Sequence, residues 1–275
     1  MSQPFTSSTI LHNGVTMPWL GLGVWKVTEE GQAENAVLAA LETGYRSIDT
    51  AAVYKNEDGV GAALAATSVP RDEIFVTTKI WNSDQGYDTA LAAFEESRKR
   101  LGLEVIDLLL IHWPVKEKYK DTWRAMEKLY RDGHVRAIGV SNFQIHHLQD
   151  LMETCEIKPM INQVEFHPLL TQEPLRAFCK ENQIQMTAWS PLMQGNLDQP
   201  VLAEIGSKYG KSAAQVVLRW DLQNGVVTIP KTVTASRMKE NADIFDFTLT
   251  DEEMAQISAL NQNKRFGADP DNFNF

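Results

Sequence analysis

The stretch Ile106-Asp-Leu-Leu-Leu-Ile-His112 decides the fold class of this chain. It is apolar at nearly every position, so a strand built from it has no side that faces solvent. Strands buried on both faces are typical of parallel sheets covered by helices, and parallel neighbours need long crossover connections. We therefore expect further apolar runs that alternate with helices.

Other apolar runs of this kind occur on both sides of Ile106–His112, and amphipathic stretches separate them. The other predicted strands are Leu20–Trp25, Tyr45–Asp49, Ile74–Ile80, Val135–Asn142, Met160–Glu165, Ile184–Ser190 and Val226–Lys231. The intervening stretches place apolar side chains at helical spacing, for example Ala33, Val37 and Leu41. Strands that alternate with helices, without a linker rich in Pro, Gly or Ser, predict a closed (β/α)8 TIM barrel of the α/β class.

Two segments lie outside this repeat. Thr9–Met17 predicts a β-hairpin that turns at Asn13-Gly14, and it is placed to plug the bottom of the barrel. Thr250–Leu260 predicts an extra C-terminal helix, and the polar tail Asn261–Phe275 follows it. We expect one domain over residues 1–275, because a barrel typically takes about 250 residues.

The alternative architecture is an open doubly wound sheet, whose usual signature is G-x-G-x-x-G after a strand. The nearest match is Gly59-Val-Gly61-Ala-Ala-Leu64, which ends in Leu and follows no predicted strand. The signature is therefore missing, and the closed barrel is favoured.

Composition excludes several function classes. The chain has 275 residues and a formal net charge of −10, which disfavours nucleic acid and anionic membranes as partners. The first residues lack a cationic region followed by an apolar run, so we expect no signal peptide, and no apolar stretch reaches about 18 residues. Cys155 and Cys179 are the two cysteines and have no metal-like spacing. We expect two reduced thiols and a cytoplasmic protein.

The predicted strands end in polar or aromatic residues, and the C-terminal ends of barrel strands carry the active site. In chain order these ends supply Trp25, Asp49, Lys79 with Trp81, His112 with Trp113, Ser141 with Asn142, Gln163, Trp189 with Ser190, and Lys231. One charged strand end means little by itself, whereas the whole series predicts a pocket on one rim.

This pocket can supply a proton but no strong nucleophile. A Lys79 ammonium beside Asp49 would lower the pKa of the nearby Tyr54 phenol, which could then protonate a carbonyl oxygen oriented by His112. The sequence has no G-x-S-x-G, P-loop or H-E-x-x-H motif. His146-His147 are adjacent on a predicted helix, so we expect them to point in different directions and predict no metal site.

A proton donor without a nucleophile calls for a hydride donor. Trp189 offers a flat face for a nicotinamide ring, and the polar ends of neighbouring strands could bind its carboxamide. Pro230–Arg237 combines two cations with hydroxyls at a helix start, which is typical of an anion site. Taken alone, a solvated helix start explains that segment equally well.

The chain resembles the aldo-keto reductase family over nearly its full length. The matching stretches are Gly44-Tyr-Arg-Ser-Ile-Asp-Thr-Ala, Tyr54-Lys-Asn-Glu, Thr78-Lys-Ile-Trp, Leu110-Ile-His-Trp-Pro, Gly139-Val-Ser-Asn-Phe, Asn162-Gln-Val-Glu-Phe-His-Pro, Ala188-Trp-Ser-Pro-Leu and Ile229-Pro-Lys-Thr. The resemblance implies a catalytic tetrad of Asp49, Tyr54, Lys79 and His112. It implies cofactor contacts at Ser141, Asn142, Gln163, Trp189, Ser190, Leu192, Lys231, Thr232, Arg237 and Asn241. Many members have Tyr where this chain has Trp189.

The resemblance further implies a function, a cofactor and a substrate class. We expect NADPH-dependent reduction of aldehydes and ketones to alcohols by a monomer, with small dicarbonyls such as methylglyoxal or diketogluconate as candidate substrates. Trp25, Trp81 and Trp113, with His112, would line the substrate pocket. A non-catalytic member of the fold and a metal-dependent barrel hydrolase are the alternatives.

The tail carries Phe266, Phe273 and Phe275. A frayed terminus is the usual fate of such a tail. The aromatic residues and the family resemblance instead predict that it folds over the barrel mouth.

Overall fold

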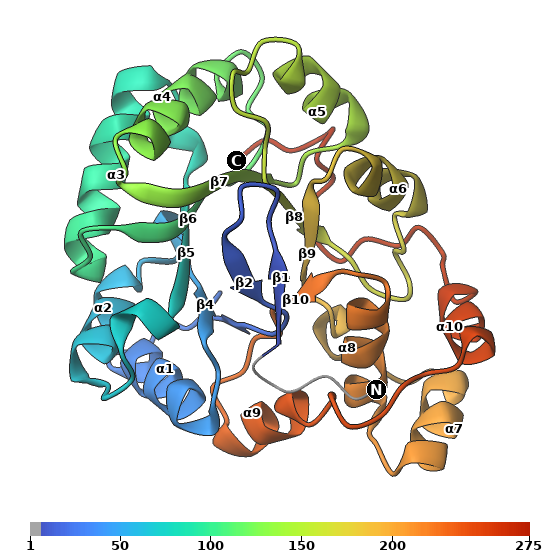
Figure 1. Cartoon of the computed structure of the whole chain (residues 1–275). Coiled ribbons are helices and arrows are strands. Elements are labelled where there is room, and N and C mark those ends of the chain that lie inside the picture. The colour runs from blue at the N-terminus through green and yellow to red at the C-terminus, as the bar shows by residue number, and fades with distance from the viewer. Residues whose placement is uncertain (1–6) are drawn as a thin grey trace.

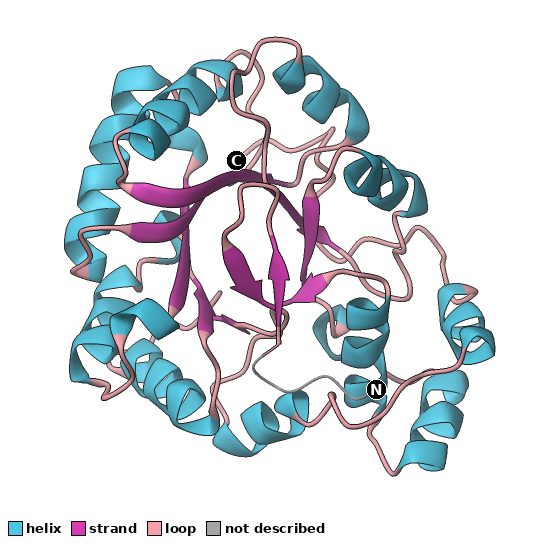
Figure 2. Cartoon of the chain, viewed as in Figure 1, coloured by secondary structure: helices cyan, strands magenta, loops and turns pink. Residues whose placement is uncertain are grey.

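The computed structural model describes residues 7–275, in which strands and helices alternate (Figures 1 and 2). The main sheet contains β3 (Leu22–Gly23), β4 (Ser47–Asp49), β5 (Phe75–Ile80), β6 (Ile106–Ile111), β7 (Val135–Ser141), β8 (Ile161–Glu165), β9 (Gln185–Trp189) and β10 (Val227–Thr228). These strands are parallel and follow chain order from β3 to β10. Parallel bridges from Leu20 to Thr228 and from Gly23 to Lys231 join the two ends of the row. The predicted (β/α)8 barrel is confirmed.

Helices surround the sheet on its outer side (Figure 2). They are α1 (Gln32–Thr43), α2 (Glu57–Ala66), α3 (Tyr87–Leu101), α4 (Tyr119–Arg131), α5 (Ile145–Met152), α6 (Glu173–Glu181), α7 (Pro200–Tyr209), α8 (Ala213–Gln223), α9 (Ala235–Ala242) and α10 (Asp251–Ser258). Every residue of β6 is buried, because side chains fill the barrel on one face and helices cover the other. Within residues 7–275, no helix is both long enough and apolar enough to cross a bilayer.

The N-terminal hairpin closes the bottom of the barrel, as the sequence predicted. Strands β1 (Ser8–Ile10) and β2 (Thr16–Pro18) pair antiparallel, and Gly14 takes a φ of 87° in the turn. The Asn13 side chain donates to the carbonyl of Arg136 at 3.0 Å, near the start of β7. Because Arg136 lies at the N-terminal end of its strand, the hairpin lies opposite the functional rim, across the barrel opening in Figure 1.

The extra C-terminal helix is also confirmed as α10. Thr250 precedes it, and its side chain accepts from the Glu253 amide while Glu253 bonds back to the Thr250 amide. The strands at the seam are shorter than predicted: Leu20–Trp25 contributes two ladder residues, and so does Val226–Lys231. Pro230 has no N–H to donate, which helps end the second of these ladders.

The glycine pair of the near-match to a dinucleotide motif serves helix packing instead. Gly59 and Gly61 lie inside α2, not in a strand-to-helix turn. A Cβ at Gly61 would lie 2.5 Å from the carbonyl oxygen of Arg100 in α3. The missing side chain therefore lets α2 and α3 approach closely.

Candidate active site

The polar strand ends converge on one cavity of about 600 Å³ at the C-terminal rim of the barrel. The predicted residues in its wall are Trp25, Asp49, Tyr54, Trp81, His112, Trp113, Ser141, Asn142, Gln163, Trp189, Ser190 and Lys231. Lys79 lies beneath this wall and is 1% exposed. Tyr54 is placed by the short helical turn η1 (Ala52–Tyr54), which is separated from the end of β4 by two residues. The barrel thus brings the expected tetrad residues together.

Lys79 and Asp49 form a buried ion pair on the neighbouring strands β5 and β4. Lys79 Nζ donates to Asp49 Oδ1 at 2.5 Å and to the Thr50 carbonyl at 2.9 Å. Burial lowers the pKa of Lys79, but the charge of Asp49 and the hydrogen bonds to Asp49 and Tyr54 outweigh burial and raise it above the ordinary value. Lys79 is therefore charged at neutral pH.

Tyr54 lies directly beside this pair. Lys79 Nζ lies 5.2 Å from the centroid of the Tyr54 ring. Burial raises the pKa of Tyr54, and the Lys79 charge and its hydrogen bond lower it. The predicted lowering of this pKa by Lys79 is therefore present, but burial is the larger effect and the net pKa lies above the ordinary value. The phenol is protonated at neutral pH, as a proton donor must be.

His112 completes this side of the cavity as a neutral ring. Its ring packs edge-on against Tyr54, with centroids 5.7 Å apart, and against Trp81 at 5.1 Å. Burial and the nearby Lys79 charge hold the pKa of His112 well below 6.5. A neutral imidazole has one N–H and one acceptor nitrogen, so it can bond a carbonyl oxygen without adding charge.

The opposite side of the cavity carries hydrogen-bonding groups around a flat ring. Trp189 Nε1 donates to Asn142 Oδ1 at 2.8 Å, and Asn142 adopts a φ of 63°. Ser141 Oγ donates to the Gln163 carbonyl at 2.8 Å, and Gln163 Nε2 donates to Asp49 Oδ2 at 2.7 Å. Gln163 therefore links the Trp189 side of the cavity to the Lys79–Asp49 pair.

Comparison with known proteins agrees with this geometry. Residues 19–262 match the model of the aldo/keto reductase family. The chain belongs to this family. It is 62% identical to "Glyoxal reductase" of Bacillus subtilis (strain 168) over 266 residues, covering 96% of both chains. It is 50% identical to "Methylglyoxal reductase DkgA" of Salmonella typhimurium over 268 residues, covering 96% of both chains. A Bombyx mori aldo-keto reductase solved in complex with NADP superimposes with a TM-score of 0.91 at 38% identity, covering 97% of this chain and 96% of that one.

The residues that the sequence predicts for an anion site in this aldo/keto reductase lie mostly outside the cavity wall. Lys231 lines the cavity, whereas Leu192, Thr232, Arg237 and Asn241 are not among its lining residues. Arg237 is an exposed residue in the first turn of α9, and Asn241 is buried one turn further on. Within residues 7–275, no carboxylate pairs with Lys231 or Arg237. Both cations can therefore bind an external anion.

The C-terminal tail of this aldo/keto reductase lies across the cavity, as its aromatic residues predicted. Phe266, Gly267 and Phe275 contribute to the wall. The Phe275 ring stacks on Trp81 with centroids 5.9 Å apart, and the Phe273 ring packs on Trp113 at 5.1 Å. The tail is thus a packed part of the site and not a frayed end.

Several cavity residues were not predicted from the sequence. Lys26 and Thr28 follow Trp25 in the first strand-to-helix loop, Val53 precedes Tyr54, and Gln194 follows β9. A wider search of the strand-to-helix loops would have found these four. Gly267 has no such signal, because only the folded tail brings it to the barrel mouth.

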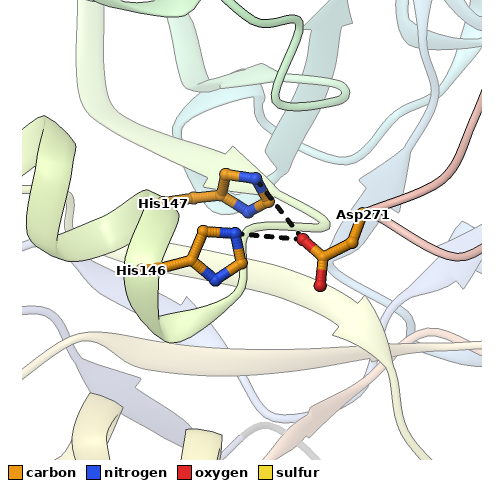
Figure 3. Close-up of side chains that lie close together, drawn as sticks. All are labelled: His146, His147 and Asp271. Carbon is orange, nitrogen blue, oxygen red and sulfur yellow. Dashed lines mark ion pairs between the residues drawn. The ribbon is translucent and has the colours of Figure 1, made fainter.

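The two adjacent histidines do not point in different directions, contrary to the expectation from their spacing. Figure 3 shows both rings facing Asp271 of the tail. Their Nε2 atoms lie 3.0 Å (His146) and 3.6 Å (His147) from Asp271 Oδ1, and their ring centroids are 4.0 Å apart. Both histidines lie in the first turn of α5, and the tail brings Asp271 close to the Nε2 atoms of both rings.

These three residues form a possible metal-ligand cluster, but two features disfavour a cation there. His147 Nδ1 accepts the Gln144 amide at 3.1 Å, so the proton of the neutral ring is on Nε2, the nitrogen that a metal would need. Burial lowers the pKa of His147 to about 4, so the ring is neutral and this Nε2 proton is its only N–H proton. The cluster also lies at the positive end of α5. The absence of a metal site therefore stays a prediction.

Proposed function

We propose that the chain reduces small aldehydes and ketones with NADPH, and that Tyr54, Lys79, Asp49 and His112 are its catalytic residues. One observation carries this proposal: a protonated Tyr54 lies between a buried Lys79–Asp49 ion pair and a neutral His112, at the base of a cavity with aromatic walls. This arrangement offers proton donation to a carbonyl oxygen and lacks an activated nucleophile.

Each member of the tetrad has a distinct role in this proposal. The Tyr54 hydroxyl protonates the oxygen of the substrate carbonyl. The Lys79 ammonium stabilises the negative charge that develops on Tyr54, and Asp49 keeps that ammonium charged. His112 orients the carbonyl oxygen by a hydrogen bond. In the reverse direction, the oxidation of an alcohol, Tyr54 accepts the proton.

The residues around Trp189 fit a nicotinamide cofactor. The hydroxyl of Ser141 and the side-chain amides of Asn142 and Gln163 match the donors and acceptors of a carboxamide, and Trp189 offers a flat stacking face. Lys231 and Arg237 would hold the 2′-phosphate, with Thr232, Asn241, Ser190 and Leu192 as further contacts to the cofactor. NADPH, when bound, supplies the hydride.

The cavity walls favour small neutral carbonyl compounds. Trp25, Trp81 and Trp113 supply apolar surface, and about 600 Å³ suits a small molecule beside a nicotinamide ring. The names of the curated relatives from Bacillus and Salmonella include glyoxal and methylglyoxal. We therefore favour small dicarbonyls over a charged sugar acid such as diketogluconate.

A substrate panel tests this function directly. NADPH consumption should be measured with glyoxal, methylglyoxal, diketogluconate and a series of simple aldehydes and ketones. We expect turnover with the small dicarbonyls and aldehydes, and no loss of activity in EDTA. An NADPH-binding protein that turns over none of these compounds would favour the non-catalytic alternative.

Cofactor choice should depend on Arg237. A guanidinium can bond a phosphate through two N–H groups, and the loss of one charge-assisted contact costs about 1.5–3 kcal/mol when it is well formed. Arg237 is exposed, so we expect Arg237→Ala to raise the Kd of NADPH by the lower end of this range, about tenfold. The Kd of NADH, measured in parallel, should hardly change. Equal weakening of the two cofactors would show that Arg237 does not contact the 2′-phosphate.

The tail aromatics should control substrate size. Trp81 and Phe275 separate the cavity from a larger surface cleft of about 1340 Å³ that both residues also line. Removing both phenyl rings in a Phe273→Ala/Phe275→Ala variant should raise KM for small carbonyls and lower it for bulky ones, because the two spaces join. NADPH affinity should stay within about twofold. An unchanged KM ranking across the panel would show that the tail does not select substrates.

The remaining assignments belong to the same proposal. We propose a cytoplasmic monomer with one domain over residues 1–275 that binds no nucleic acid. Cys155 and Cys179 are free thiols, which suits a reducing compartment. Light scattering coupled to size exclusion would test the monomer, and salt-dependent retention of DNA or RNA would contradict the absence of nucleic-acid binding.

A further inference from the structure

Glu165 is a buried carboxylate next to the active site that the tetrad and the cofactor contacts do not use. It ends β8, two residues after Gln163, and it is 0% exposed. No Lys or Arg within residues 7–275 pairs with it. Burying a carboxylate is costly unless hydrogen-bond donors replace water. The hydrogen-bond donors around the Glu165 carboxylate therefore indicate which part of the structure this residue holds in place.

Two of those donors are backbone amides of the C-terminal tail, and the third is the neighbouring His167. Glu165 Oε1 accepts from the Phe266 amide at 2.6 Å, and Oε2 accepts from the Gly267 amide at 3.2 Å. His167 Nε2 donates to Oε1 at 3.1 Å, and the His167 ring also packs against the Phe266 ring with centroids 5.4 Å apart. A carboxylate at the end of β8 thus fixes the backbone of the tail where it crosses the barrel mouth.

Fixed in this way, Gly267 lies directly on the ring of Trp189. A Cβ at position 267 would lie 2.3 Å from Trp189 Cη2 and 3.0 Å from Cζ3, so only glycine fits. At its other end the Trp189 ring donates its indole N–H to Asn142 Oδ1 at 2.8 Å. The ring is therefore held at one end by the tail and at the other by a residue of the proposed carboxamide site.

We propose that Glu165 is a positioning residue for the nicotinamide-stacking ring. It presses Gly267 against Trp189, which keeps both Trp189 and Asn142 in the orientation that receives the cofactor before the cofactor arrives. This inference rests on the proposed function, in which the nicotinamide ring stacks on Trp189. It makes NADPH affinity depend on the order of the tail, through a carboxylate that does not touch the cofactor.

The first test compares two buried carboxylates that each accept hydrogen bonds from two backbone amides. Glu127 in α4 is 3% exposed and accepts the amides of Glu156 and Ile157, both at 2.7 Å, outside the cavity wall. Glu165→Gln and Glu127→Gln should both lower Tm. Only Glu165→Gln should raise the Kd of NADPH, by about tenfold. An unchanged NADPH Kd in Glu165→Gln, with Tm lowered as in Glu127→Gln, would show that Glu165 is only structural.

The second test does not alter Glu165 and holds even if Glu165→Gln fails to fold. Gly267→Ala places a methyl group against Trp189 Cη2 and Cζ3. These two atoms belong to the indole ring and have no counterpart in a tyrosine side chain. We expect Gly267→Ala to raise the Kd of NADPH about tenfold in the wild-type background and less than about twofold in the Trp189→Tyr background. Equal effects in both backgrounds, or none in either, would overturn the proposal.

Trp189→Ala distinguishes a failure of the Glu165 proposal from a failure of the proposed nicotinamide site at Trp189. If Trp189→Ala binds NADPH as tightly as the wild-type protein, the nicotinamide does not stack there, and both proposals fail together. If Trp189→Ala weakens NADPH binding while Gly267→Ala and Glu165→Gln do not, the stacking site at Trp189 is supported and only the role of Glu165 is overturned. NADPH titration followed by fluorescence measures every variant in the same way.

Discussion

Replacing Tyr54 by Phe should lower kcat for carbonyl reduction by at least about 100-fold. The substitution removes the hydroxyl that is the proposed proton donor but keeps the ring that packs against His112. NADPH affinity should stay within about twofold, because Tyr54 lies on the catalytic side of the cavity and not among the groups around Trp189. Steady-state kinetics and an NADPH titration on the same preparation provide both values.

Tyr130→Phe is the matched control for this experiment. The Tyr130 hydroxyl accepts from Asn13 Nδ2 at 3.3 Å, on the hairpin side of the barrel and away from the cavity. Its loss should cost at most a little stability and no turnover. If Tyr54→Phe kept more than about a tenth of wild-type kcat, the proton donor would be another group, and His112 would be the first candidate.

The positions of the proposed catalytic residues could be predicted from the sequence, because the strands of a parallel barrel are buried on both faces. Such strands are continuous apolar runs, and the polar residue at the end of each run marks the rim. Ile106–His112 and Ile74–Ile80 therefore placed His112 and Lys79 correctly without any contact information.

Features that depend on long-range packing could not be predicted. The net direction of the Tyr54 pKa depends on how deeply the folded chain buries the phenol, which a sequence does not state. The contact of Asp271 with His146 and His147 requires the path of the tail over α5. Glu165 was overlooked for the same reason, because its partners lie about a hundred residues further along the chain.

Substitution of Lys79 should produce the second large effect, on stability and activity at once. Lys79→Met leaves Asp49 buried with Gln163 Nε2 as its remaining side-chain donor, and breaking a buried pair in this way costs about 3–5 kcal/mol of unfolding free energy. Asp49→Asn should destabilise by a similar mechanism, because it leaves a buried ammonium without its counter-ion. Denaturant unfolding of the two single variants measures both losses.

Stability and activity should separate in the Asp49→Asn/Lys79→Met double variant. With both charges gone, no uncompensated ion remains buried, so the double variant should regain most of the stability lost in either single variant. Activity should stay at least about 100-fold below wild type, because Lys79 also lowers the pKa of Tyr54, and without it the phenol becomes a weaker acid in the same buried site. A double variant as unstable as the singles would mean that lost packing, and not an uncompensated buried charge, causes the instability. A stable double variant with wild-type turnover would show that proton donation by Tyr54 does not depend on the ammonium. Low activity in a stable protein is the result that assigns the ion pair to catalysis.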